Sequence, residues 1–88
     1  MKIKDFQVAS DATLKSLAIS CLRGGATNSY ADAKENVTLA DRLEAMNGEM
    51  DITPEDAVRI RSVIGAAGIP SIVKVKAVDA FDPSSESE

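Results

Sequence analysis

The chain has 88 residues, 44 % of them hydrophobic, and a formal net charge of −4, which suits one small folded domain and disfavours binding to nucleic acid by general phosphate attraction. It contains no histidine and a single cysteine, Cys21, which excludes Ser-His-Asp and Cys-His catalysis, histidine-ligated zinc and an intrachain disulfide. We therefore expect no cofactor and no bound metal.

The first two predicted elements are an extended arm and a helix. Residues 1–9 alternate apolar and polar side chains, which predicts an extended N-terminal arm over the core or a single edge strand, and we favour the arm. Apolar residues then recur at helical spacing, which predicts a helix over residues 10–23. Ser10 or Asp11 would cap its start, and the glycines at 24–25 would end it in a left-handed cap conformation.

The second predicted helix covers residues 28–46, with Asn28 or Ser29 as its cap. Its apolar stripe changes face near the middle, and a capping-like spacing follows. One continuous helix and two helices broken at residues 36–38 are therefore both open, and we favour the single helix. A turn at residues 47–48 ends it.

The third predicted helix has the clearest start signal in the chain. Thr53 is a capping residue, Pro54 fits the first helical position, and Glu55 and Asp56 suit the positive end of the helix dipole. We expect this helix to end at Gly68.

The last element, residues 70–81, is ambiguous between a strand and a helix. Its β-branched residues and the alternation over residues 73–77 favour a strand. An apolar pattern that continues through Phe81 favours a helix, which we adopt.

The predicted fold class is all-α, with four or five short helices and an extended N-terminal arm in one domain of residues 1–82. The alternative is an α+β fold, in which residues 70–78 pair as a strand with residues 2–8. Residues 83–88 are polar and acidic and are expected to form a flexible tail.

The turn between the first two helices has the composition of an anion cradle. Glycines permit close backbone approach, and a helix start offers free amide hydrogens to a phosphate or carboxylate. The stretch lacks the lysine and spacing of a phosphate-binding loop, so a glycine stop and an ordinary capped helix start form the simpler interpretation. The candidate ligand-binding residues are Arg23, Gly24, Gly25, Thr27, Asn28, Ser29 and Tyr30.

Two surfaces are candidates for contacts with macromolecules. If the last two helices fold back on each other, they form a basic patch, although the final helix lacks the polar start of a DNA recognition helix. Apolar residues around the end of the second helix suit either an adaptable partner-binding surface or the core. The basic residues are Arg59, Arg61, Lys74 and Lys76, and the apolar ones are Leu39, Leu43, Met46 and Met50.

Acidic pairs and the cysteine complete the candidates. Asp32 with Glu35, and Asp41 with Glu44, are spaced by three residues on one helix, but they lack the spacing of a calcium loop, so solvated surface acids are the simpler interpretation. Cys21 lies on the apolar stripe of the first helix, which predicts a buried thiol.

These features together predict a non-enzymatic protein-interaction module, a small regulator or inhibitor of the kind found among the accessory proteins of bacterial viruses. We expect it to act by occupying a partner protein's surface and to form a homo-oligomer, because a small core of aliphatic side chains gains from further burial. The alternatives are a binder of a nucleotide-like anion at an oligomer interface and a DNA-binding regulator that uses the last two helices. A polar start and short apolar runs predict a cytoplasmic protein with no membrane partner.

Overall fold

The computed structural model describes residues 2–25 and 29–82. This part of the chain is mostly helical, with four helices and two two-stranded sheets. The all-α prediction is therefore confirmed only in its helical content, and the fold is closer to the α+β alternative. In chain order the elements are β1 (Lys2–Ile3), β2 (Gln7–Ala9), β3 (Ala12–Thr13), α1 (Leu14–Gly24), α2 (Tyr30–Ala45), β4 (Met50–Asp51), α3 (Pro54–Ala66) and α4 (Ser71–Ala80).

The strands correct the prediction of an unpaired N-terminal arm. β1 pairs antiparallel with β4, and β2 pairs antiparallel with β3 in a hairpin that turns at residues 10–11. The pairing of residues 70–78 with residues 2–8 is wrong, because residues 71–80 form α4 and β1 takes β4 as its partner.

The start of α1 differs from the prediction because residues 10–11 belong to the hairpin turn. Thr13 is the actual cap: its hydroxyl accepts from the Ser16 amide, and the Ser16 hydroxyl accepts from the Thr13 amide. The carboxylate of Asp5 also accepts a hydrogen bond from the Lys15 amide at 2.9 Å. The bond from Lys15 to Asp5 fastens the loop between β1 and β2 to the first turn of α1.

The end of α1 needs glycine for space. Gly25 caps the helix with an extended backbone, φ −72°, so the predicted left-handed cap is wrong. A Cβ atom at this position would lie 2.6 Å from the backbone oxygen of Cys21. In the described part of the chain only Gly48, in the turn after α2, has a positive φ, of 78°.

The other three helices agree closely with the sequence. Ser29 caps α2 by accepting from the Asp32 amide, and α2 continues without a break, which confirms the single helix. Thr53 and Asp56 form a reciprocal capping box at the start of α3. α4 begins directly after Pro70 and is helical to Ala80, which confirms the helix over the strand.

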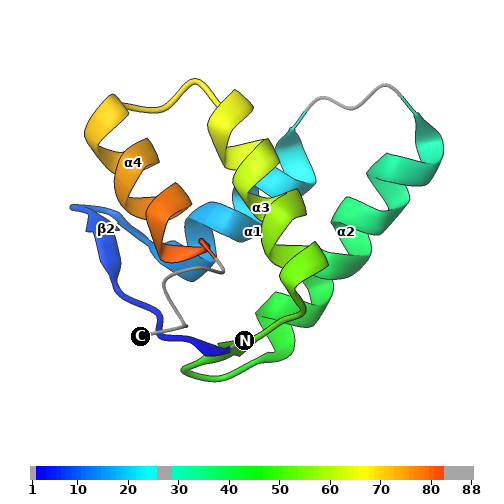
Figure 1. Ribbon diagram of the computed structural model, residues 1–88, viewed down its shortest axis with the longest axis horizontal. Helices are drawn as coiled ribbons and strands as arrows, with labels where there is room; N and C mark the ends of the chain where they lie inside the picture. The colour runs from blue at the N-terminus through cyan, green and yellow to red at the C-terminus, as the bar shows by residue number, and fades with distance from the viewer. Residues whose placement is uncertain (1, 26–28, 83–88) are drawn as a thin grey trace.

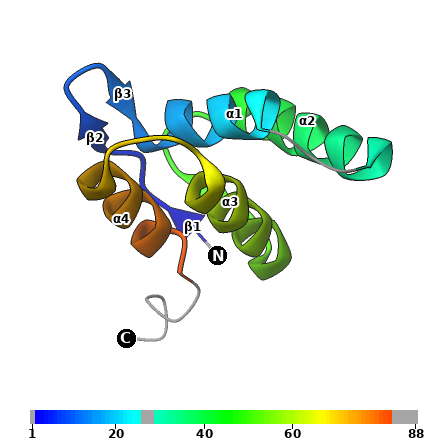
Figure 2. The same cartoon turned by 90° about the horizontal axis from the view of Figure 1, so that it is seen from above.

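The helices enclose one hydrophobic core. α1 packs against α2 and α3, while α4 packs against α3 and β2. Figure 1 shows α2 and α4 on opposite sides of α3, and Figure 2 shows α1 and α2 in one layer with α3 and α4 in the other. The largest fully buried side chains are Phe81, Leu14, Leu22, Leu43, Met50, Ile60 and Ile64. The predicted tail, residues 83–88, lies outside the described residues.

Candidate functional site

The predicted anion cradle is not assembled by the described residues. The guanidinium of Arg23 donates to Glu44 at 3.0 Å and to Asp41 at 2.9 Å, both on α2. These hydrogen bonds raise the pKa of Arg23 and lower the pKa of Glu44. Two carboxylates therefore balance the charge that would have bound an anion. Thr27 and Asn28 lie outside the described residues.

The remaining cradle residues serve other roles. Ser29 caps α2, and the side chain of Tyr30 is 81 % exposed. Gly24 and Gly25 line a hollow of about 470 Å³ between the C-terminal ends of α1 and α3. Burial raises the pKa of Cys21 in its wall, which keeps the thiol neutral. The apolar members of the lining are Leu17, Val63, Ala66, Ala67 and Ile69.

The four predicted basic residues do not form one patch. Arg59 reaches from α3 toward α2, whereas Arg61 on the same helix lies 4.0 Å from the carboxylate of Asp82. Lys74 is partly buried on α4, and Lys76 borders the β2–β3 hairpin. The basic-patch prediction is corrected because these cations face different neighbours.

The predicted apolar interaction surface lies inside the protein. Leu39, Leu43 and Met50 are at most 2 % exposed. Met46 is partly buried against the same core, and its sulfur accepts a hydrogen bond from the Asp51 amide. These side chains are core in the folded chain, which corrects the prediction of a surface.

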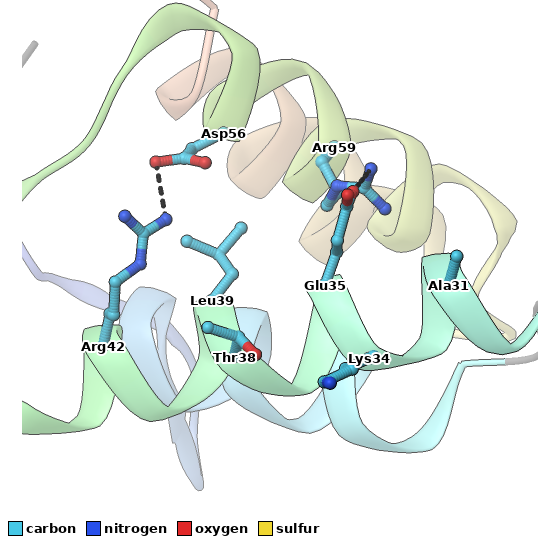
Figure 3. A pocket seen from close by; sticks show the side chains of 8 residues that line it. All are labelled: Ala31, Lys34, Glu35, Thr38, Leu39, Arg42, Asp56 and Arg59. Carbon is cyan, nitrogen blue, oxygen red and sulfur yellow. Dashed lines mark hydrogen bonds and ion pairs between the residues drawn. The ribbon is translucent and has the colours of Figure 1, made fainter.

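A groove between α2 and α3, which we call the α2–α3 groove, is a further candidate site. It has a volume of about 420 Å³ and runs along one face of α2, with α3 as the opposite wall (Figure 3). Its lining from Ala31 to Arg42 covers about three turns, or about 16 Å, of α2. The lining residues are Ala31, Lys34, Glu35, Thr38, Leu39, Arg42, Asp56 and Arg59.

Two ion pairs cross the α2–α3 groove. Arg42 of α2 donates to Asp56 of α3 at 2.9 Å, and Arg59 of α3 pairs with Glu35 of α2. Figure 3 shows both pairs, with Leu39 of α2 pointing into the space between them. The groove therefore has a central apolar side chain and a charged bridge on each side of it.

Arg59 has a further role in the α2–α3 groove. Its guanidinium also donates to the side-chain oxygen of Asn36 at 2.9 Å and lies 3.8 Å from Asp32. Asn36 is only 2 % exposed, so this hydrogen bond satisfies an acceptor that water reaches poorly. The position of α3 relative to α2 is thus tied to a buried amide.

The charge of the α2–α3 groove is nearly balanced. Each lining acid, Glu35 and Asp56, faces an arginine of the opposite helix. Lys34 has no ion pair or hydrogen bond with any described residue, and its ammonium is exposed. The lining therefore leaves one unpaired positive charge at the rim of the groove, on the side of α2 away from α3 (Figure 3).

Both predicted acid pairs hold arginines. Asp32 and Glu35 contact Arg59, as Asp41 and Glu44 contact Arg23. The four acids are exposed, which fits their interpretation as surface charges. Each pair also links α2 to a neighbouring helix through an arginine.

Sequence reasoning did not single out Arg42, which lines the α2–α3 groove, or Asn36, which accepts a hydrogen bond from Arg59. Arg42 meets Asp56 across fourteen positions of the chain, and Asn36 meets Arg59 across twenty-three, so neither pair has a local signature. A polar residue at helical spacing among apolar ones was the only available signal for Asn36.

Neither the comparisons with known proteins nor a search of the described residues for metal sites and membrane spans assigns a further site to the chain. No protein family, curated protein or solved structure matches the chain. Across residues 2–25 and 29–82, no group of three or more acidic, histidine or cysteine side chains is placed to hold a metal ion. In the same ranges, every helix is too short or too polar to cross a membrane.

Proposed function

We propose that the protein is a non-enzymatic protein-interaction module that holds a segment of a partner protein in the α2–α3 groove. By occupying that segment it regulates or inhibits the partner. The observation that carries the proposal is the groove itself: a channel along three turns of a helix, with Leu39 at its centre and ion pairs on either side. The proposed setting is the cytoplasm, where a lone cysteine stays reduced.

The shape of the α2–α3 groove favours a peptide segment over a small ligand. Sites for small molecules enclose most of the ligand surface, whereas this groove is open along α2 (Figure 3). Amphipathic helices bind such grooves by placing apolar side chains from successive turns into them.

The charges favour a segment with one acidic side chain near its apolar anchor. The anchor would fill the space above Leu39, which is 2 % exposed and forms the buried floor of the groove, and a carboxylate of the segment would approach Lys34. The charge-assisted contact would set the direction of the segment, because rim charges contribute more to specificity than to affinity.

A site-specific crosslinking experiment tests this proposal. A photoreactive residue at Thr38, inside the groove, is expected to capture a discrete partner in cells, and Lys34→Glu should reduce the yield about tenfold. The same photoreactive residue at Ser62, exposed on α3, is the matched control. Equal capture from both positions, or capture unaffected by Lys34→Glu, would contradict the proposal.

Neither alternative function is favoured by an observation. An anion binder would require Arg23 to be available, and Asp41 and Glu44 already engage it. A DNA-binding regulator would require Arg59 and Arg61 to face the same way, and they pair on opposite sides of α3.

A further inference from the structure

α4 has apolar side chains on its outer face as well as on its inner face. Ala77 and Phe81 are fully buried on the inner face, yet Ile72 is 67 % exposed and Val75 is 57 % exposed on the outer one. Ile72 and Val75 are three residues apart and therefore adjacent on the helix surface. These two side chains form a small exposed apolar patch on the outer face of α4.

We propose that the outer face of α4 is a homodimer interface and that a second copy of this chain covers it. The face is Ile72, Val75, Lys76 and Asp79, and its charges sum to zero. An isologous dimer brings the same patch of two copies together. A patch with a net charge would therefore meet the same charge on the second copy and be repelled, whereas the outer face of α4 has no net charge.

An antiparallel arrangement of the two α4 helices also matches the order of the charges. If the two-fold axis passes between Val75 and Lys76, the Val75 side chains of the two copies meet at the axis. Lys76 of one copy then lies about 6 Å along the helix axis from Asp79 of the other, given a rise of 1.5 Å per residue. A lysine side chain spans that distance, so the face is self-complementary in charge.

The size of this face predicts a weak dimer. The ten residues of α4 extend only about 15 Å, and interfaces that bury less than about 1,200 Å² in total belong to weak or transient complexes. We therefore expect a reversible equilibrium between monomer and dimer.

This inference is independent of the proposed function. α4 and α2 lie on opposite sides of α3 (Figure 1), and no residue of the α2–α3 groove belongs to the outer face of α4. The dimer would leave the groove free, and failure of either proposal leaves the other standing.

Sedimentation equilibrium on the full chain tests the interface with a charge-neutral double variant, Ile72→Glu/Val75→Lys. Glutamate near the start of α4 and lysine in its interior are both compatible with a helix, so the variant should keep its fold, as checked by circular dichroism. We expect the dimer dissociation constant to rise about tenfold or more. The matched control, Tyr30→Glu/Val37→Lys, makes the same changes at exposed apolar residues of α2 and should leave that constant unchanged.

A second measurement needs no variant. Amide chemical shifts of the wild-type chain over a dilution series should change with concentration at residues 71–79 and stay constant along α2. Three results would overturn the inference: a wild-type chain that is monomeric up to millimolar concentration, a dimer that both double variants weaken equally, or concentration-dependent shifts confined to other elements.

Discussion

Arg59 ties α3 to α2 through a hydrogen bond that differs in kind from its ion pairs. The amide of Asn36 is buried and receives the guanidinium of Arg59 at 2.9 Å, whereas Glu35 and Asp32 are exposed partners. Exposed ion pairs contribute little to stability, about 0–1 kcal/mol. Loss of the donor to a buried acceptor costs more, about 1–3 kcal/mol.

The substitution Arg59→Met should therefore lower the free energy of unfolding by about 1–2 kcal/mol. Methionine keeps an apolar stem but cannot donate to Asn36. Arg42→Met is the matched control, because Arg42 also bridges the α2–α3 groove but pairs only with Asp56 among the described residues, and its loss should cost less than about 1 kcal/mol. Urea denaturation measures both, and equal losses would show that the buried amide does not depend on Arg59.

Glu44 should give the protein a pH-dependent contribution to stability. Its hydrogen bond from Arg23 lowers the pKa of its carboxyl in the folded state, so the contribution is present above the unfolded-state pKa, about 4.3, and is lost as pH falls through the lower folded-state value. The urea midpoint of Glu44→Gln should therefore lie below that of the wild type at pH 6, and the difference should disappear toward pH 3. Glu49→Gln, at an acid without an ion pair to any described residue, is the matched control for the loss of one carboxylate. A Glu44→Gln difference that persisted at pH 3 would contradict the linkage.

At the scale of the element, α1 and α3 contain glycines with opposite structural roles. Gly25 lies at the cap of α1, where the backbone oxygen of Cys21 leaves no room for a side chain. Gly65 lies within α3, and a Cβ atom there would contact nothing within 4 Å. One glycine is thus required by packing, while the other only weakens its helix.

Two alanine substitutions should therefore change stability in opposite directions. Gly25→Ala should destabilise the chain by about 1–3 kcal/mol, because backbone must move to admit the methyl group. Gly65→Ala should stabilise it by about 0.5–1 kcal/mol through helix propensity. Thermal unfolding followed by circular dichroism measures both shifts in midpoint, and a shift of the same sign for both would show that the space around Gly25 can relax.

Elements with local signals were predictable, and elements that depend on distant residues were not. The cap at Thr53, the proline at 54 and the cap at Ser29 mark helix starts within a few residues of chain, and α2 and α3 follow them. The strand pair of β1 with β4 joins residues almost fifty positions apart. The misplaced start of α1 has the same origin, because the β2–β3 hairpin takes the residues that otherwise offer caps.

At the scale of the whole molecule, the candidate site depends on how two helices are placed. The predicted apolar surface became core because Leu39, Leu43 and Met50 point inward once α1 packs against both α2 and α3. The same packing leaves α2 and α3 side by side and creates the α2–α3 groove between them. A pattern along one helix shows which residues are apolar, but the partner of each apolar face is a property of the tertiary structure.

Phe81, directly after α4, is one of the largest fully buried side chains of the core that positions both proposed interfaces. Phe81 is fully buried, and it follows α4 where that helix packs against α3 and the β2–β3 hairpin. Truncation of such a side chain removes burial and leaves a cavity, at a cost of about 3–5 kcal/mol. A small domain has about 5–15 kcal/mol in total, so this single residue holds a large share of the stability.

The substitution Phe81→Ala should therefore bring the chain close to its unfolding threshold, with a loss of about 3–5 kcal/mol. Phe6→Ala makes the same chemical change at a side chain that is 42 % exposed, and it should cost less than about half as much, because the ring gives up less burial. The substitution at Phe6 also leaves the hydrogen bond from the Leu14 amide in place, because that amide donates to the backbone oxygen of Phe6 and not to its ring. Urea denaturation, analysed with one m-value for both variants, measures the two losses of unfolding free energy. Similar losses for Phe81→Ala and Phe6→Ala would show that α4 is not anchored through Phe81.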